Sequence, residues 1–296
     1  MKNTKPKVRL WSVLTGLTAI LTVAAIVGNI IANQYATTLN VALNASTYKI
    51  IKGETTGDTE YFKKGFASDE EREAYEAELC ATVEAEGAAL LKNENNALPL
   101  ASGAKVSLFG HGSVDLMYGG TGSGSVDTSK APNLKDALEA QGITINQTLW
   151  DLYKSDSMMS KYSRMTPASI SDTLEANTQY AVNEAPWSAL SSAESSFAEY
   201  GDAAIVVLSR SGGEGADLPS GENGTNDSWI SGQEGDGNYL ALSAEEIELL
   251  QNLKALKDNG TFKNIIVLIN SSNAIELDFL NPAICGEDYG IDAAMW

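Results

Sequence analysis

The stretch AAIVVLSRSGGEGAD, from Ala203 to Asp217, is the part of the chain from which the fold can be argued most directly. Its first six residues are apolar, largely β-branched and of strand length, which is typical of a strand buried on both faces of a sheet. Glycines follow, and they let the backbone turn sharply and approach a ligand closely. The pattern therefore puts one carboxylate, Glu214, on a loop at the carboxyl end of a buried strand, where open α/β sheets bind ligands. A solvated surface glutamate is the alternative that composition alone leaves open.

Strands and helices alternate along the rest of the chain. Strands are predicted at residues 106–109, 143–145, 203–208, 264–269 and 292–296. Helices are predicted from a capping box at Ser68 to about Leu91, at 133–140, at 147–153, and from a second capping box at Ser243 to Lys257. In the first helix the positions expected to face the core are Leu79, Val83, Ala85, Ala89 and Leu90. This alternation predicts an α/β fold with a mostly parallel sheet sandwiched by helices.

The N-terminus predicts one transmembrane helix. Four basic residues among the first nine precede an uncharged stretch over residues 10–32, and about 20 apolar residues suffice to cross a bilayer. Basic residues before such a helix keep the N-terminus in the cytoplasm, so the remaining chain is expected outside it. A cleaved signal peptide, which would give a secreted protein, is the competing interpretation.

These signals divide the chain into four segments. They are a cytoplasmic basic segment at residues 1–9, a signal anchor at 10–32, a linker at 33–67 and an α/β domain at 68–296. The last predicted strand runs to the final residue, so we expect the domain to be incomplete at its C-terminal end. Residues 212–237 are rich in glycine and polar residues and are predicted to form a long loop beside Glu214, of the kind that often covers an active site.

Composition excludes several classes of function. A formal net charge of −19 argues against binding to nucleic acid. The two cysteines, Cys80 and Cys285, form no C-x-x-C pair, and His111 is the single histidine, so we predict no metal site and no cofactor. Cys80 is expected to be a small buried residue, and whether it pairs with Cys285 stays open.

Three loops that follow predicted strands are expected to converge at one edge of the sheet. The first runs from Gly110 into the glycine-rich segment at 119–125, the second carries Glu214, and the third is the run Asn270 to Asn273. The first loop is neither a Walker A sequence nor a dinucleotide fingerprint, and it lacks the G-x-S-x-G of a hydrolase nucleophile. Glycine mixed with serine and threonine suits hydrogen bonding to sugar hydroxyls, and a flexible surface loop is the alternative.

The chain resembles glycoside hydrolase family 3, the family of β-glucosidases and β-xylosidases, and specifically its α/β sandwich domain. The matching pieces are EGAALLKN at 86–93, LPL at 98–100, VSLFG at 106–110, GTGSG at 120–124, SRSGGEGAD at 209–217, YLALS at 239–243 and IVLIN at 266–270. Their order and spacing together make the resemblance specific.

The resemblance implies hydrolysis of O-glycosyl bonds with retention, on a β-linked oligosaccharide or glucoside. In the family the sandwich domain supplies the general acid/base glutamate, and a separate (β/α)₈ barrel supplies the aspartate nucleophile and most sugar contacts. Glu214 matches the acid/base, and Ser123 matches a serine that touches the sugar in some members. Gly122, Arg210 and Asp217 complete the predicted substrate-binding set.

The resemblance also carries a departure, because an apolar helix rather than a barrel precedes the domain. Some family members have the sandwich first, so the barrel is expected beyond Trp296. Without it we expect Glu214 to be exposed and the chain to be inactive. The alternative from a different class is a non-catalytic, membrane-tethered module that binds carbohydrate or has a structural role.

Overall fold

The computed structural model describes residues 5–43, 45, 64–120, 122–124, 126–164, 180–214 and 239–296. The chain divides into two units, residues 1–72 and 73–296, which are described separately.

The first unit contains the predicted apolar helix. Helix α1, Lys5–Gln34, includes a 27-residue span, Val8–Gln34, that is long and apolar enough to cross a membrane. A second short helix, α2, Ala36–Ala42, lies inside the segment predicted as a linker. Most of the remaining linker lies outside the described residues.

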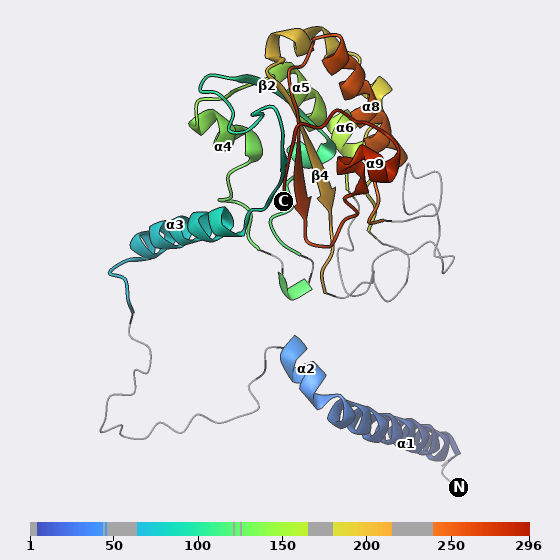
Figure 1. The fold of residues 1–296 in the computed structure, drawn as a ribbon. Coiled ribbons are helices and arrows are strands. Elements are labelled where there is room, and N and C mark those ends of the chain that lie inside the picture. Colours follow the sequence, from blue (N-terminus) through green and yellow to red (C-terminus); the bar gives the residue numbers. More distant parts are fainter. Residues whose placement is uncertain are drawn as a thin grey trace. The chain divides into compact units, whose positions relative to one another are not determined.

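The second unit is built on one six-stranded sheet (Figure 1). In sheet order the strands are β1 (Leu90–Asn93), β6 (Ala293–Met295), β5 (Ile265–Ser271), β4 (Ala203–Arg210), β2 (Lys105–Phe109) and β3 (Thr144–Ile145). All neighbouring pairs are parallel except β1 with β6. The mostly parallel α/β fold is therefore as predicted.

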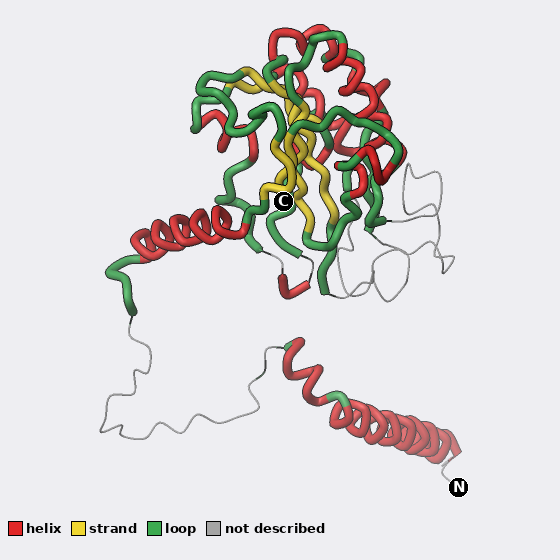
Figure 2. Tube along the Cα trace, in the orientation of Figure 1, coloured by secondary structure: helices red, strands yellow, loops and turns green. Residues whose placement is uncertain are grey.

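Helices and short 3-10 turns occupy the connections between the strands (Figure 2). The helices are α3 (Asp69–Gly87), α4 (Leu134–Ala140), α5 (Gln147–Lys154), α6 (Asp156–Lys161), α8 (Ala244–Asp258) and α9 (Pro282–Cys285). The 3-10 turns are η1 (His111–Ser113), η2 (Gly122–Gly124), η3 (Trp187–Leu190), η4 (Glu194–Tyr200) and η7 (Asp278–Leu280). Their starts follow the sequence closely, since Ser243 forms the predicted capping box with Glu246 and Asn133 caps α4.

The core lies around β4, in which all eight residues are buried. Three phenylalanines gather beside it, with ring centroids 5.2 Å apart for Phe109 and Phe197 and 5.7 Å apart for Phe109 and Phe262. These edge-to-face contacts add to the burial of apolar surface that drives folding. The run that suggested a strand buried on both faces is thus the centre of the domain.

The first helix of the domain is shorter than predicted. Helix α3 ends at Gly87, and residues 90–93 form β1, whose neighbour Ala89 exchanges backbone hydrogen bonds of 2.6 and 2.9 Å with Trp296. Pairing with a distant strand outweighs the helix propensity of this leucine-rich run.

The predicted inward face of this helix is also wrong. No residue of α3 is buried, and Leu79 and Val83 remain 47% and 62% exposed, because none of the described elements covers the apolar stripe. Cys80 is exposed as well, and neither it nor Cys285 forms a disulfide.

Candidate functional site

The carboxyl ends of β2, β4 and β5 form the edge of the sheet where the three predicted loops meet. In the sheet, β3 lies on one side of β2 and β4 lies on the other side. The connections from β2 and to β4 therefore run in opposite directions, and the edge between β2 and β4 is a topological switch point. In Figure 1 the small green turn η2 lies beyond the arrowheads of these strands. Open α/β sheets bind ligands at such points, which makes this edge the candidate site.

Glu214 lies in a turn four residues beyond the end of β4, and its side chain is exposed. Ser123 donates two hydrogen bonds to Glu214 Oε2, from its backbone N at 2.9 Å and from Oγ at 2.5 Å. The Oγ bond and the backbone bond stabilise the carboxylate and hold the pKa of Glu214 below its ordinary value. Glu214 is therefore exposed, as expected, and its pKa is shifted towards the charged form.

Close backbone contacts between the two loops explain the glycines. Gly122 has a φ of +72°, and a Cβ built on it would lie 2.7 Å from Glu214 Cβ. A Cβ on Gly120 would lie 3.0 Å from the carbonyl oxygen of Gly212. Only glycine permits this backbone conformation and this approach together, so the predicted glycine-rich loop is what brings Ser123 to Glu214.

Arg210 is placed differently from what a substrate-binding role requires. Its side chain is fully buried, with all five N–H groups directed at protein acceptors: two on Glu246 and three on the carbonyls of Ser209, Tyr239 and Ala241. As placed, Arg210 has no N–H left to donate to a sugar. It ties the end of β4 to the start of α8. Asp217, the last predicted binding residue, lies outside the described residues.

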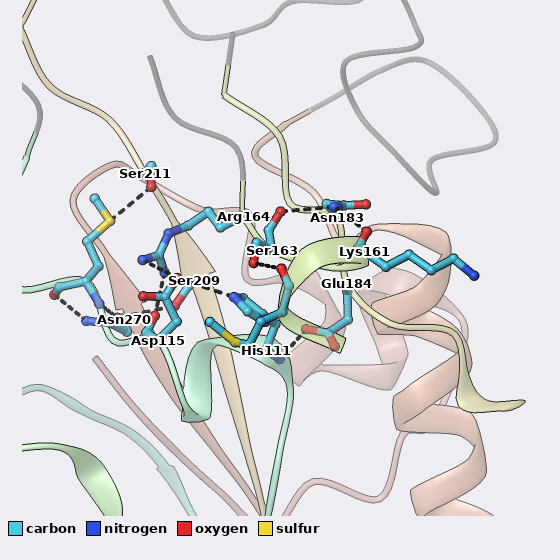
Figure 3. Close-up of polar contacts among 12 residues, drawn as sticks. His111, Asp115, Lys161, Ser163, Arg164, Asn183, Glu184, Ser209, Ser211 and Asn270 are labelled. Atoms are coloured by element: carbon cyan, nitrogen blue, oxygen red, sulfur yellow. Dashed lines mark hydrogen bonds and ion pairs between the residues drawn. The ribbon is translucent and has the colours of Figure 1, made fainter. Parts of the chain in front are cut away.

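A partly buried polar cluster next to this edge was not anticipated from the sequence (Figure 3). Arg164 and His111 both contact Asp115 Oδ2, at 3.0 and 3.3 Å. Glu184 accepts hydrogen bonds from the backbone N of His111 at 2.7 Å and of Ala185 at 2.9 Å. These contacts fix the start of the loop that follows β2, at His111 and Asp115.

Glu184 has an unusual charge state. Burial raises the pKa of Glu184 to about 7, and the two backbone N–H groups only partly offset that effect. It lies in the segment from Ser155 to Ser196 that sequence patterns leave unassigned, and no motif marks it. Among the described residues, no group of acidic, histidine and cysteine side chains could hold a metal ion.

Comparison with known proteins gives the family of this domain. The profile described as "Glycosyl hydrolase family 3 C-terminal domain" matches residues 88–290. The chain is 34% identical over 146 residues to Beta-glucosidase A of Butyrivibrio fibrisolvens, covering 47% of this chain and 15% of that protein.

Solved structures give the same result for the fold. A β-glucosidase from Paenibacillus barengoltzii superposes with a TM-score of 0.52 at 25% identity, covering 74% of this chain and 21% of that one. β-Glucosidase 3B from Thermotoga neapolitana, in complex with glucose, gives 0.53 at 23% identity, covering 76% and 27%.

The fold and the family match thus define an α/β domain of the glycoside hydrolase class. The chain belongs to glycoside hydrolase family 3, and it contains the domain that is C-terminal in the family's description. It spans between about a seventh and a quarter of the length of the relatives named above.

The raised pKa of Glu184 predicts a fall in stability with rising pH. Between the ordinary value of 4.5 and about 7, the folded chain keeps a proton that the unfolded chain has lost. The free energy of unfolding should therefore fall through this window, by about 1.4 kcal/mol per pH unit, and level off above it. Urea unfolding at pH 5 and pH 7.5 should show the fall in the natural chain and a smaller one in Glu184→Gln. Glu248→Gln, which changes another carboxylate that accepts a backbone N–H, should retain it. An equal fall in Glu184→Gln would contradict the assignment.

The Ser123 contact predicts a measurable shift at Glu214. Ser123→Ala removes the Oγ donor that favours the carboxylate, so the pKa of Glu214 should rise towards its ordinary value. NMR titration of ¹³C-carboxyl-labelled glutamate, with Glu214→Gln to assign the signal, measures this. Ser129→Ala removes a serine beside Asp127 and should leave Glu214 unchanged. A Glu214 midpoint that Ser123→Ala does not move would show that the contact is not made in solution.

Proposed function

We propose that this chain supplies the general acid/base, Glu214, of a β-glucosidase-like retaining glycosidase. The observation that carries the proposal is the placement of Glu214 on a turn beyond the buried strand β4, held by Ser123 from the glycine-rich loop. Membership of glycoside hydrolase family 3 supports a β-linked glucoside as the substrate class.

In the proposed reaction Glu214 acts twice. Protonated, it donates its proton to the leaving oxygen while a second carboxylate attacks the sugar and forms a glycosyl–enzyme intermediate. As a carboxylate, it then takes a proton from the water that hydrolyses this intermediate. A retaining glycosidase needs the two carboxyl groups about 5–5.5 Å apart. We propose that a (β/α)₈ barrel domain brings the second one.

Ser123 and Gly122 have separate parts in this proposal. Ser123 orients the carboxyl group of Glu214, and we propose that its hydroxyl also contacts a hydroxyl of the sugar. Gly122 has no side chain, which lets the loop approach Glu214 closely. Asp217 remains a proposed substrate contact.

We further propose that α1 is a signal anchor that holds the domain outside the cytoplasm. The uncharged run at residues 10–32 of this helix and the basic residues before that run support this topology. A cleaved signal peptide would give the same side of the membrane without the tether.

The proposal predicts that the chain alone does not hydrolyse glycosides. Incubating the purified full chain, in detergent, with 4-nitrophenyl β-glucoside should release no nitrophenol above the buffer rate, because the proposed nucleophile lies on another domain. Turnover that Glu214→Gln abolishes would contradict the need for a second domain. The companion assay repeats the incubation with the chain mixed with a (β/α)₈ barrel domain of the family.

The proposal also makes a prediction for the chain joined to a (β/α)₈ barrel domain. Glu214→Gln should lower turnover of an alkyl β-glucoside by about 10²–10⁴-fold, the usual contribution of general acid–base catalysis. A dinitrophenyl glucoside, whose leaving group needs no proton, should form the intermediate normally, and azide should restore its turnover. Glu287→Gln, at an exposed loop position, should leave activity unchanged. Full activity of Glu214→Gln on the alkyl glucoside would refute the acid/base role and favour a non-catalytic binding module.

A further inference from the structure

The third strand-end loop contains two asparagines that contact the other two loops. Asn270 is the penultimate residue of β5 and lies opposite Ser209 of β4 in the sheet register. Asn273 follows two residues after the end of β5. Neither belongs to the predicted acid/base or substrate-binding residues, and both are half-buried at the candidate site.

Asn270 binds the backbone N–H and C=O of one residue of the first loop through both ends of its side-chain amide. Its Oδ1 accepts from the backbone N of Met117 at 2.5 Å, and its Nδ2 donates to the backbone O of Met117 at 3.0 Å. Ser209 Oγ also donates to Asn270 Oδ1, at 3.2 Å, which fixes the orientation of the amide. The Asn270 side chain thus connects the end of β5 to Met117 in the loop by two hydrogen bonds.

Met117 is the base of the segment that ends in Ser123. Beyond it the chain passes through Gly119, Gly120 and Gly122 before it reaches Ser123. Glycines restrict the backbone least of all residues, so the segment cannot define its own path. The described contacts along it include the Asn270 clamp at Met117, a hydrogen bond from Tyr118 Oη to the backbone O of Pro132 at 2.8 Å, and the Glu214 contact at Ser123. Of these, the clamp at Met117 ties the segment to the end of β5.

Asn273 holds the second loop in a similar way. Its Nδ2 donates to the backbone O of Ser211 at 2.7 Å, and a Cβ on Gly212 would lie 2.1 Å from its Oδ1, so the side chain lies flat against the loop. Tyr239 Oη binds the backbone of the same residue, accepting from Ser211 N and donating to Ser211 O. The base of the Glu214 turn is therefore held from two sides.

We propose that Asn270 is a positioning residue, which fixes the glycine-rich loop at Met117 and thereby sets Ser123 against Glu214, while Asn273 holds the Glu214 side. This inference rests on the proposed function only for its catalytic consequence. The contact that it explains, Ser123 on Glu214, exists whether or not the chain takes part in glycoside hydrolysis. One amide side chain on the rigid sheet then controls the environment of a carboxyl group that it does not touch.

The test is a double-mutant cycle read at Glu214 in the full chain. Asn270→Ala should raise the NMR midpoint of Glu214 by at least as much as Ser123→Ala, because release of the loop removes both the Oγ and the backbone donor of Ser123. In the double variant the midpoint should equal that of Asn270→Ala alone, since no Ser123 contact is left for the second change to remove. Additive shifts, or no shift in Asn270→Ala, would overturn the proposal.

Asn264→Ala is the matched control. Asn264 precedes the same strand at its opposite end, where its Nδ2 donates to the backbone O of Asp202 at 3.4 Å. It should cause a comparable loss of strand-end contact and leave the Glu214 midpoint unchanged. A shift of equal size in this variant would mean that general loosening of β5, and not the clamp, moves Glu214.

A measurement on the unchanged chain covers the case in which Asn270→Ala fails to fold. The clamp predicts that the amide hydrogen of Met117 exchanges with solvent as slowly as those of β5, although Met117 lies in a loop. Fast exchange at Met117 would overturn the proposal without any variant.

The catalytic consequence is read separately, in the chain joined to a barrel domain. Asn270→Ala should lower kcat on an alkyl glucoside, because Glu214 is less well oriented, and should move the alkaline limb of the pH profile to higher pH, with KM little changed. If Glu214→Gln is fully active but the cycle behaves as described, the proposed function fails and the clamp stands. If Glu214→Gln is inactive and the cycle is additive, the clamp fails and the proposed function stands.

Discussion

The buried ion pair between Arg210 and Glu246 connects the last residue of β4 to the first turn of α8. Both side chains are almost completely buried, and a charge left alone in such a place would be strongly destabilising. The pair is tolerated because every N–H of the guanidinium has an acceptor and because Glu246 also accepts from the backbone N of Ser243 in the capping box. The same guanidinium therefore fixes the segment that leaves β4, the carbonyls of Tyr239 and Ala241, and the start of α8. The turn that carries Glu214, four residues beyond Arg210, therefore starts from a firmly held end of β4.

Much of the fold was predictable, because the strongest signals in the sequence are those that the core uses. The run from Ala203 to Leu208 and the capping box at Ser243 each report a local preference that the folded domain keeps. The meeting of three loops at one sheet edge followed from parallel strand order, since parallel strands present their carboxyl ends together. The pairing of Glu214 with Ser123 needed no more than that convergence and a glycine-rich loop.

The errors share a physical cause, which is contact between residues far apart in the chain. Arg210 reads as a ligand-binding residue because it follows a strand, but a strand buried on both faces has no polar side to indicate where its last residue points. Its direction is set by Glu246, 36 residues later. The predicted helix extended to about Leu91, into β1, because the strand partner of β1 lies some 200 residues away, with Asn93 opposite Ala293. Glu184 carries no local pattern at all, and only its burial against His111 makes it distinctive.

Ser123 imposes a constraint on how Glu214 could work as an acid/base. Two hydrogen bonds to one carboxylate oxygen favour the charged form, which suits the step in which Glu214 takes a proton from water. The first step needs the opposite form, and an exposed carboxyl group with a lowered pKa is almost always charged near neutral pH. In the proposed reaction an opposing effect would have to come from the proposed barrel domain, either by removing water from Glu214 or by bringing a second carboxylate close to it, since both raise the pKa of a carboxyl group. A nucleophile about 5 Å away would supply the second effect as soon as the domains meet. In that arrangement the charge on the nucleophile favours the protonated Glu214, and neutralisation of that charge in the covalent intermediate returns Glu214 to the state that Ser123 stabilises.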